Sequence, residues 1–304
     1  MIRGDIMNSN DFVDMITKKF NYSIELQDYL KKVIPALITY YGEERKDTIY
    51  RALNECEIHI QGKDEDCNEF LKNYFNRQSD LDLPLSAGAF YETCIQLKGN
   101  RPVLKSIIYL RTIWLRDYVG FDFNDENKMS TLTHEICHAI KGYGKLREEN
   151  GVLTDMTGLC KSYYKLDKAT GEFIEEKSIN TGLEEAFNCY DEKEIMTIMT
   201  GKKRELDAYV SLVQLADMLA EIPNLLKAVQ SSQFSGGSEW IEFLSPIGAK
   251  FISENTEMAY LPFVSDLGKE GVFEKVLADQ EMAEDNLVAF IDAYKKALEE
   301  AHRK

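Results

Sequence analysis

The sequence of 304 residues lacks long hydrophobic runs and an obvious export signal. No stretch approaches the roughly 18 to 20 uninterrupted apolar residues that a membrane-spanning helix requires. The opening residues, MIRGDIMNSNDF, contain no apolar segment followed by a small-residue cleavage site, so we expect no secretory signal there. These absences predict a protein that neither spans nor binds a membrane.

Cysteine and positive charge are also scarce. The six cysteines lie far apart, without a Cys-x-x-Cys pair, which is typical of reduced thiols rather than of a disulfide framework. We therefore expect a cytoplasmic protein. The 36 Lys and Arg residues against 52 Asp and Glu residues give a formal net charge of −16. Such a field repels nucleic acid and anionic lipid, so we expect neither as a partner.

Hydrophobic periodicity predicts an α+β fold. An apolar stripe of helical period lies between Ser23, a candidate N-cap, and Gly42. Strand-like segments follow at 57–60, 89–97 and 106–114, and a hairpin is predicted at 159–175 around a turn at 167–171. From residue 183 onward the pattern is mainly helical, with apolar stripes at 206–229 and 284–303. We expect a small early sheet surrounded and followed by helices.

This pattern suggests three segments, which can form one compact domain. Residues 1–127 hold the N-terminal helix and small sheet, and residues 128–200 hold the chemically informative motifs. Residues 201–304 form a helical C-terminal part.

The most informative pattern is His-Glu-x-x-His, at His134, Glu135 and His138. On a helix, residues four apart differ by about 40° around the axis and one turn along it, so both imidazoles face the same way. Two neutral ring nitrogens, a carboxylate and an open position for water suit Zn²⁺. Glu135 would lie beside the same cleft, where it can take a proton from water held by the metal and pass it to the departing amine.

The residues around this pattern predict an amphipathic helix that ends at Gly142. The expected buried face consists of Met129, Leu132, Ile136 and Ile140. His134 and His138 lie on the opposite side, where a site lining a cleft would place them. Cys137 points away from the histidines, and we expect a packed thiol there. The alternative interpretation is an ordinary amphipathic helix with two surface histidines.

A further helix is predicted to open at Thr181 with the residues TGLEEAFN. Here the sequence resembles the gluzincin branch of the zincin metallopeptidases, whose second-helix signature has an aliphatic residue, then Asn-Glu, then Gly or Ala. The resemblance covers about residues 105 to 190 and is specific only at the two motifs. It implies a zincin-like fold, Glu185 as the third zinc ligand beside His134 and His138, and a peptide or protein substrate.

The sequence departs from the family pattern in two places. His138 and Glu185 are 47 positions apart, longer than in thermolysin-like members, and the hairpin takes up the extra length. The acidic residue common four positions after the ligand is replaced by Cys189. If Glu184 were the ligand, that position would be Asn188, a good hydrogen-bond partner for a histidine. We favour Glu185, and a solvated first turn without metal is the alternative for both glutamates.

Two more roles follow from the resemblance. Related peptidases bind extended substrate along an edge strand above the cleft, and the strand predicted at 106–114 is the candidate, with a core strand as the alternative interpretation. The oxyanion of the transition state needs a donor besides zinc, for which Tyr209 is the candidate, and a tyrosine that only packs in the core is the alternative.

The sequence therefore predicts a zinc-dependent metallopeptidase with Glu135 as general base. The competing hypothesis is a zincin-like regulatory or interaction protein whose metal site is structural or vestigial. The intact Glu135 favours the enzyme, because a structural site has no need of that carboxylate.

Overall fold

The computed structural model describes residues 7–80, 88–99, 101–114, 117–149, 152–203 and 210–264, together with a few residues between 282 and 296. The chain divides into two units. The first is Met1–Leu146, Lys165–Ile174 and Glu192–Arg204, and the second is Arg147–Tyr164, Glu175–Asp191 and Glu205–Lys304. The mixture of helices with small sheets confirms the α+β class.

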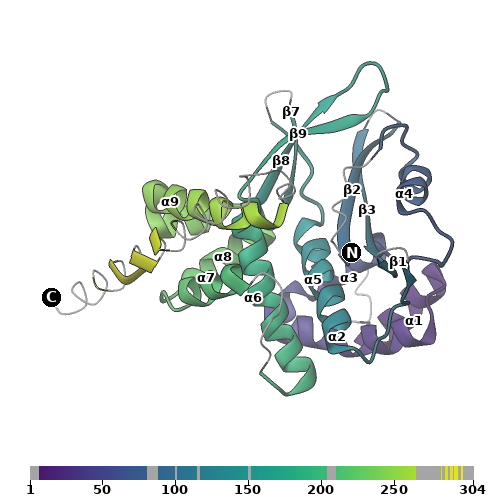
Figure 1. The fold of residues 1–304 in the computed structure, drawn as a ribbon, viewed down its shortest axis with the longest axis horizontal. Coiled ribbons are helices and arrows are strands. Elements are labelled where there is room, and N and C mark those ends of the chain that lie inside the picture. Colours follow the sequence, from purple (N-terminus) through teal and green to yellow (C-terminus); the bar gives the residue numbers. More distant parts are fainter. Residues whose placement is uncertain are drawn as a thin grey trace. The chain divides into compact units, whose positions relative to one another are not determined.

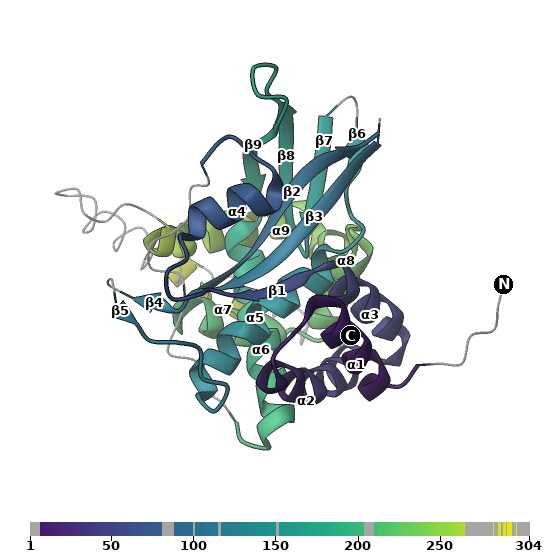
Figure 2. The same cartoon turned by 90° about the vertical axis from the view of Figure 1, so that its right-hand side faces the viewer.

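The first unit combines a helical bundle with a three-stranded sheet (Figure 2). Its helices are α1 (Ser9–Phe20), α2 (Ile24–Tyr41), the 3₁₀ turn η1 (Glu43–Arg45), α3 (Lys46–Glu55), α4 (Cys67–Phe75) and α5 (Glu126–Gly142). Its strands are β1 (Glu57–Ile60), β2 (Ala89–Lys98), β3 (Arg101–Leu110) and the short pair β4 (Ile113–Trp114) and β5 (Asp117–Tyr118). As predicted, α2 begins after Ser23, whose side chain accepts a hydrogen bond from the Leu26 N–H, and ends at Gly42.

The sheet has the order β1-β3-β2, with β3 parallel to β1 and antiparallel to β2. Side chains alternate across β3, so Ile107 and Tyr109 pack with Leu71 and Phe75 of α4 on one face. Helix α5 contacts β2 and β3 on the other side, behind the sheet in Figure 2. The sheet is therefore covered on both faces.

The strand predicted at 106–114 differs from the one observed. It begins earlier and ends at Leu110, and Ile113–Trp114 belongs to a separate pair with Asp117–Tyr118. The interpretation of Ser106–Leu110 as an edge strand is wrong, because all of β3 pairs with β2 on one side and Ile107–Leu110 pair with β1 on the other. The hydrophobic run that made it the strongest strand candidate reflects burial on both faces, which is typical of a central strand. In the described part of the chain, β2 is the edge next to α5.

The second unit holds a four-stranded sheet of order β6-β7-β8-β9 and the C-terminal helices (Figure 1). The elements are β6 (Arg147–Glu149), β7 (Val152–Thr157), β8 (Cys160–Leu166), β9 (Phe173–Ile179), α6 (Thr181–Thr200), α7 (Val210–Ala220), α8 (Leu225–Ser235) and α9 (Glu239–Val264). The predicted hairpin is present as β8 and β9, but it extends a larger sheet. The tip of this hairpin, Lys165–Ile174, and the C-terminal half of α6 belong to the first unit.

The core of the second unit is formed by α6 to α9. Leu183 and Phe187 of α6 pack with Leu212, Leu219 and other apolar residues of α7, α8 and α9. None of the described helices combines the length and the apolar character that crossing a membrane would require. The helix predicted at 284–303 lies for the most part outside the described residues.

Candidate metal centre

Helix α5 presents the His-Glu-x-x-His pattern. It begins after Asp125, whose carboxylate accepts hydrogen bonds from the backbone N–H groups of the first turn, and ends at Gly142. Of the expected apolar face, Leu132, Ile136 and Ile140 are buried and Met129 is half-buried. Every residue from Leu132 to Gly142 lies in the interior, including both histidines. The alternative interpretation, an ordinary amphipathic helix with two surface histidines, is therefore wrong.

The two histidines of the pattern point at each other. The Nε2 atoms of His134 and His138 are 3.1 Å apart, and their rings cross at 77°. Two nitrogens that share a tetrahedral zinc ion at 2.0–2.1 Å are about 3.3 Å apart. The observed separation therefore fits two ligands of one ion with little movement. Both side chains are 7% exposed, so few waters compete for these nitrogens.

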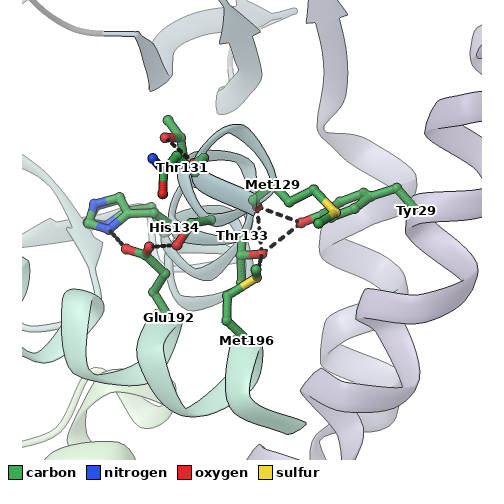
Figure 3. Close-up of polar contacts among 10 residues, drawn as sticks. Tyr29, Met129, Thr131, Thr133, His134, Glu192 and Met196 are labelled. Carbon is green, nitrogen blue, oxygen red and sulfur yellow. Dashed lines mark hydrogen bonds and ion pairs between the residues drawn. The ribbon is translucent and has the colours of Figure 1, made fainter. Parts of the chain in front are cut away.

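A carboxylate on α6 fixes the orientation of His134 (Figure 3). Glu192 Oε2 lies 3.1 Å from His134 Nδ1, and Ser130 Oγ donates a hydrogen bond to Glu192 Oε1. A carboxylate oxygen beside Nδ1 favours the tautomer with the proton on Nδ1 and the lone pair on Nε2, the nitrogen that faces His138. This is the tautomer that a histidine binding a metal through Nε2 requires.

A second group of contacts holds α5 on the side of α2 (Figure 3). The Tyr29 hydroxyl lies 2.8 Å from Thr133 Oγ1, which in turn lies 3.3 Å from Met196 Sδ on α6. Tyr29 also donates to the Met129 carbonyl. Burial raises the pKa of Tyr29, which keeps its hydroxyl protonated. Helices α2, α5 and α6 are thus linked next to the histidines.

Helix α6 also carries Glu185. It lies seven residues before Glu192, and seven residues are about two helical turns, so both side chains leave α6 on nearly the same side. The atoms that His134, His138 and Glu185 can offer to a cation lie within 4.8 Å of one another. The donor set is therefore two imidazoles and one carboxylate, which is a common ligand set of catalytic zinc sites.

The neighbouring Glu184 has a structural role. Its carboxylate accepts hydrogen bonds from the Leu159 N–H at 2.7 Å and from Gln233 Nε2 at 3.1 Å. It also fills the space beside Gly158, where a Cβ atom would come within 2.0 Å of Glu184 Oε2. Glu184 thus ties the β7–β8 turn to α6 and α8. It belongs to neither donor group found among the described residues.

The remaining predicted residues are placed as follows. Glu135 follows His134 directly on α5 and is buried, with 8% of its surface exposed. Cys137 is completely buried, as expected of a packed thiol. Tyr209 lies outside the described residues.

Sequence reasoning missed Glu192. The position four residues after Glu185, where the family pattern places an acidic residue, holds Cys189 and gave no such signal. The signal that could have found Glu192 is the spacing of seven residues, which returns a carboxylate to the same side of the helix. Cys189 itself belongs to a second donor group, with His134 and Glu192.

Neither the family models nor the curated proteins nor the solved structures contain a match to this chain. The functional argument therefore depends on the geometry of the residues themselves.

Proposed function

We propose that the protein is a zinc-dependent peptidase of gluzincin type, with His134, His138 and Glu185 as the metal ligands. A single observation carries the proposal. The Nε2 atoms of the two histidines face each other at 3.1 Å, close to the separation of two ligands of one zinc ion, and Glu192 Oε2 lies 3.1 Å from Nδ1 of His134, so that the ring directs Nε2 toward His138. A zincin-like arrangement of sheet and motif helix agrees with the packing of α5 against β2 and β3.

When bound, zinc supplies a Lewis acid that polarises a substrate carbonyl and makes water more acidic. Glu135 then acts as the proton carrier: it accepts the proton from the attacking water and delivers it to the nitrogen of the departing amine. Its position directly after His134, in the interior, suits that role because few solvent molecules compete for the proton. Glu192 and Ser130 keep the His134 ring fixed throughout.

A peptide substrate is part of the proposal because the two motifs resemble those of peptidases. Strand β2 supports it, because an extended peptide can pair with an edge strand through backbone hydrogen bonds. β2 is the edge strand that packs against α5, and it is ten residues long.

The decisive experiment compares Glu135→Gln with the wild-type protein after loading with one equivalent of zinc. We expect the variant to retain zinc and to lose turnover of a peptide library, because the amide cannot accept a proton. Glu126→Gln is the matched control, since Glu126 is an exposed glutamate in the first turn of the same helix. Retained zinc with no turnover in either wild type or control would instead favour a regulatory protein with a structural metal site.

A further inference from the structure

A second group of possible metal ligands consists of His134, Cys189 and Glu192. Cys189 and Glu192 lie three residues apart on α6, so they occupy the same side of that helix, one turn apart. Glu192 Oε2 is 3.1 Å from His134 Nδ1. One donor atom from each of these three residues lies within 4.8 Å of the others. All three side chains are buried, and Cys189 is completely so.

We propose that His134, Cys189 and Glu192 form a second metal site, which takes a thiophilic divalent cation and competes with the first donor set for His134. This proposal does not depend on peptidase activity. It concerns only which cation these residues bind and what happens to the neighbouring donor set.

The chemistry of the donors selects the cation. A thiolate is a soft ligand and favours Cd²⁺ over Mg²⁺ and Ca²⁺, which prefer oxygen alone. The first donor set, with two imidazoles and a carboxylate, contains no sulfur. Zn²⁺ is borderline-soft and is bound well by two imidazoles and a carboxylate, so it occupies the first set, whereas the softer Cd²⁺ gains more from the second. Cd²⁺ is the sharpest probe, since its bond to a thiolate absorbs in the ultraviolet and its bonds to nitrogen and oxygen do not.

Competition follows because both donor sets contain His134. Its Nε2 lies 3.1 Å from His138 Nε2, and its Nδ1 lies 3.1 Å from Glu192 Oε2. A neutral imidazole has one lone pair and therefore binds one cation. When Cd²⁺ binds at Nδ1, the Cys189 thiol releases its proton to the solvent and the ring N–H is at Nε2, so His134 no longer serves the first donor set. Filling the second site therefore removes one of the three ligands from the first.

The test uses the full-length chain in a Cys67→Ser/Cys160→Ser background, which removes the two thiols that are only partly buried. This parent protein is loaded with one equivalent of zinc and titrated with Cd²⁺. Two signals are followed together: the cadmium–thiolate absorption and the zinc released to a chelating dye. We expect about one equivalent of cadmium–thiolate absorption, and zinc release that rises in step with it.

Cys189→Ser in the same background should lose the absorption. We also expect the Cd²⁺ concentration for half-release of zinc to rise at least about tenfold, because a direct ligand matters no less than an outer-shell partner. Cys137→Ser is the matched control: its thiol is equally buried, on α5, and belongs to no donor group among the described residues. It should behave like the parent. Cys189→Ala replaces the serine variant if circular dichroism shows that the latter does not fold.

Two results would overturn the proposal. One is absorption and zinc release in Cys189→Ser equal to those of the parent. The other is full cadmium–thiolate absorption in the parent while zinc stays bound, because the two donor sets would then be independent. The absorption measured on metal-free protein tests the second site alone, so its outcome is separate from that of the Glu135→Gln experiment.

Discussion

Two histidines of the first unit each pair with a glutamate, but they use different ring nitrogens. His59 on β1 places Nε2 2.9 and 3.0 Å from the two oxygens of Glu65. His134 on α5 places Nδ1 against Glu192 and keeps Nε2 toward His138. The same pair of residue types therefore gives one histidine whose Nε2 is engaged by a carboxylate and one whose Nε2 faces the Nε2 of a second histidine.

The surroundings of the His59–Glu65 pair also indicate a structural role. The His59 ring stacks on Phe70 with 3.9 Å between ring centroids, and the Tyr109 hydroxyl donates to Glu65 at 2.6 Å. Burial and the neighbouring Glu65 raise the pKa of Tyr109, so it remains a donor. This cluster joins β1, β3 and α4. We therefore expect the His59–Glu65 pair to be structural, and we propose metal binding only for His134, whose Nε2 faces a second histidine.

The strongest test of this comparison removes one histidine from each region. His138→Ala should abolish stoichiometric zinc binding, because two of three protein ligands do not hold the ion against a chelator. His59→Ala should leave one equivalent of zinc bound. Metal analysis after dialysis against a weak chelator measures both. Equal zinc loss in the two variants would break the distinction between the regions.

The next largest effect on zinc binding is expected when the glutamate of each pair, Glu192 or Glu65, is replaced. Glu192→Gln should weaken zinc binding by about tenfold, the lower end of the range for outer-shell partners, because the amide oxygen still accepts from Nδ1. Glu65→Gln should leave zinc affinity unchanged. Competition titrations with a chromophoric chelator give both values. An unchanged affinity in Glu192→Gln would show that this carboxylate does not set the tautomer of His134.

Tyr109→Phe tests whether the cluster around His59 and Glu65 contributes to stability and not to zinc binding. The variant loses one hydrogen bond to a carboxylate that is partly exposed, so we expect a loss of about 1 kcal/mol in the free energy of unfolding. Zinc affinity should stay the same. Urea unfolding of the metal-free protein measures the first quantity. A drop in zinc affinity without a loss of stability would contradict the structural role.

The smallest effect is expected for Ser130→Ala. Its hydroxyl donates to Glu192 Oε1, so its loss leaves the carboxylate less firmly oriented but still beside His134 Nδ1. Zinc affinity should fall only a few-fold, less than in Glu192→Gln. Thr131→Ala is the control, because Thr131 Oγ1 bonds only the backbone of its own helix at 3.0 Å. Should Ser130→Ala exceed Glu192→Gln in its effect, the proposed order of the chain Ser130–Glu192–His134 would be wrong.

Local signals predicted much of the fold. The N-cap at Ser23, the strand at 57–60 and the hairpin turn at 167–171 depend on neighbouring residues, and the structure contains all three. The position of β3 in its sheet could not be read in this way. Pairing with both β1 and β2 depends on contacts between segments far apart in the sequence, which a run of apolar residues does not specify.

In the candidate site, too, features set by local spacing could be predicted, and features set by contacts between distant segments could not. The helical period brings His134 and His138 together, and this could be predicted from a spacing of four. The structural role of Glu184 could not be predicted, because its carboxylate accepts hydrogen bonds from Leu159 and Gln233, which are distant in the sequence and come close only in the fold. The burial of the polar side of α5 from Leu132 onward could not be predicted for a related reason, because its polar residues meet Tyr29, Glu192 and Met196, which reach them through the fold.

The central claim is that two imidazoles and the Glu185 carboxylate bind one zinc ion. X-ray absorption spectroscopy of the protein with one equivalent of zinc tests it most directly. The account predicts two imidazole ligands and oxygen at about 2.0–2.1 Å, without sulfur, and the loss of one oxygen ligand in Glu185→Ala. A sulfur ligand at about 2.3 Å, or a spectrum unchanged in Glu185→Ala, would contradict it.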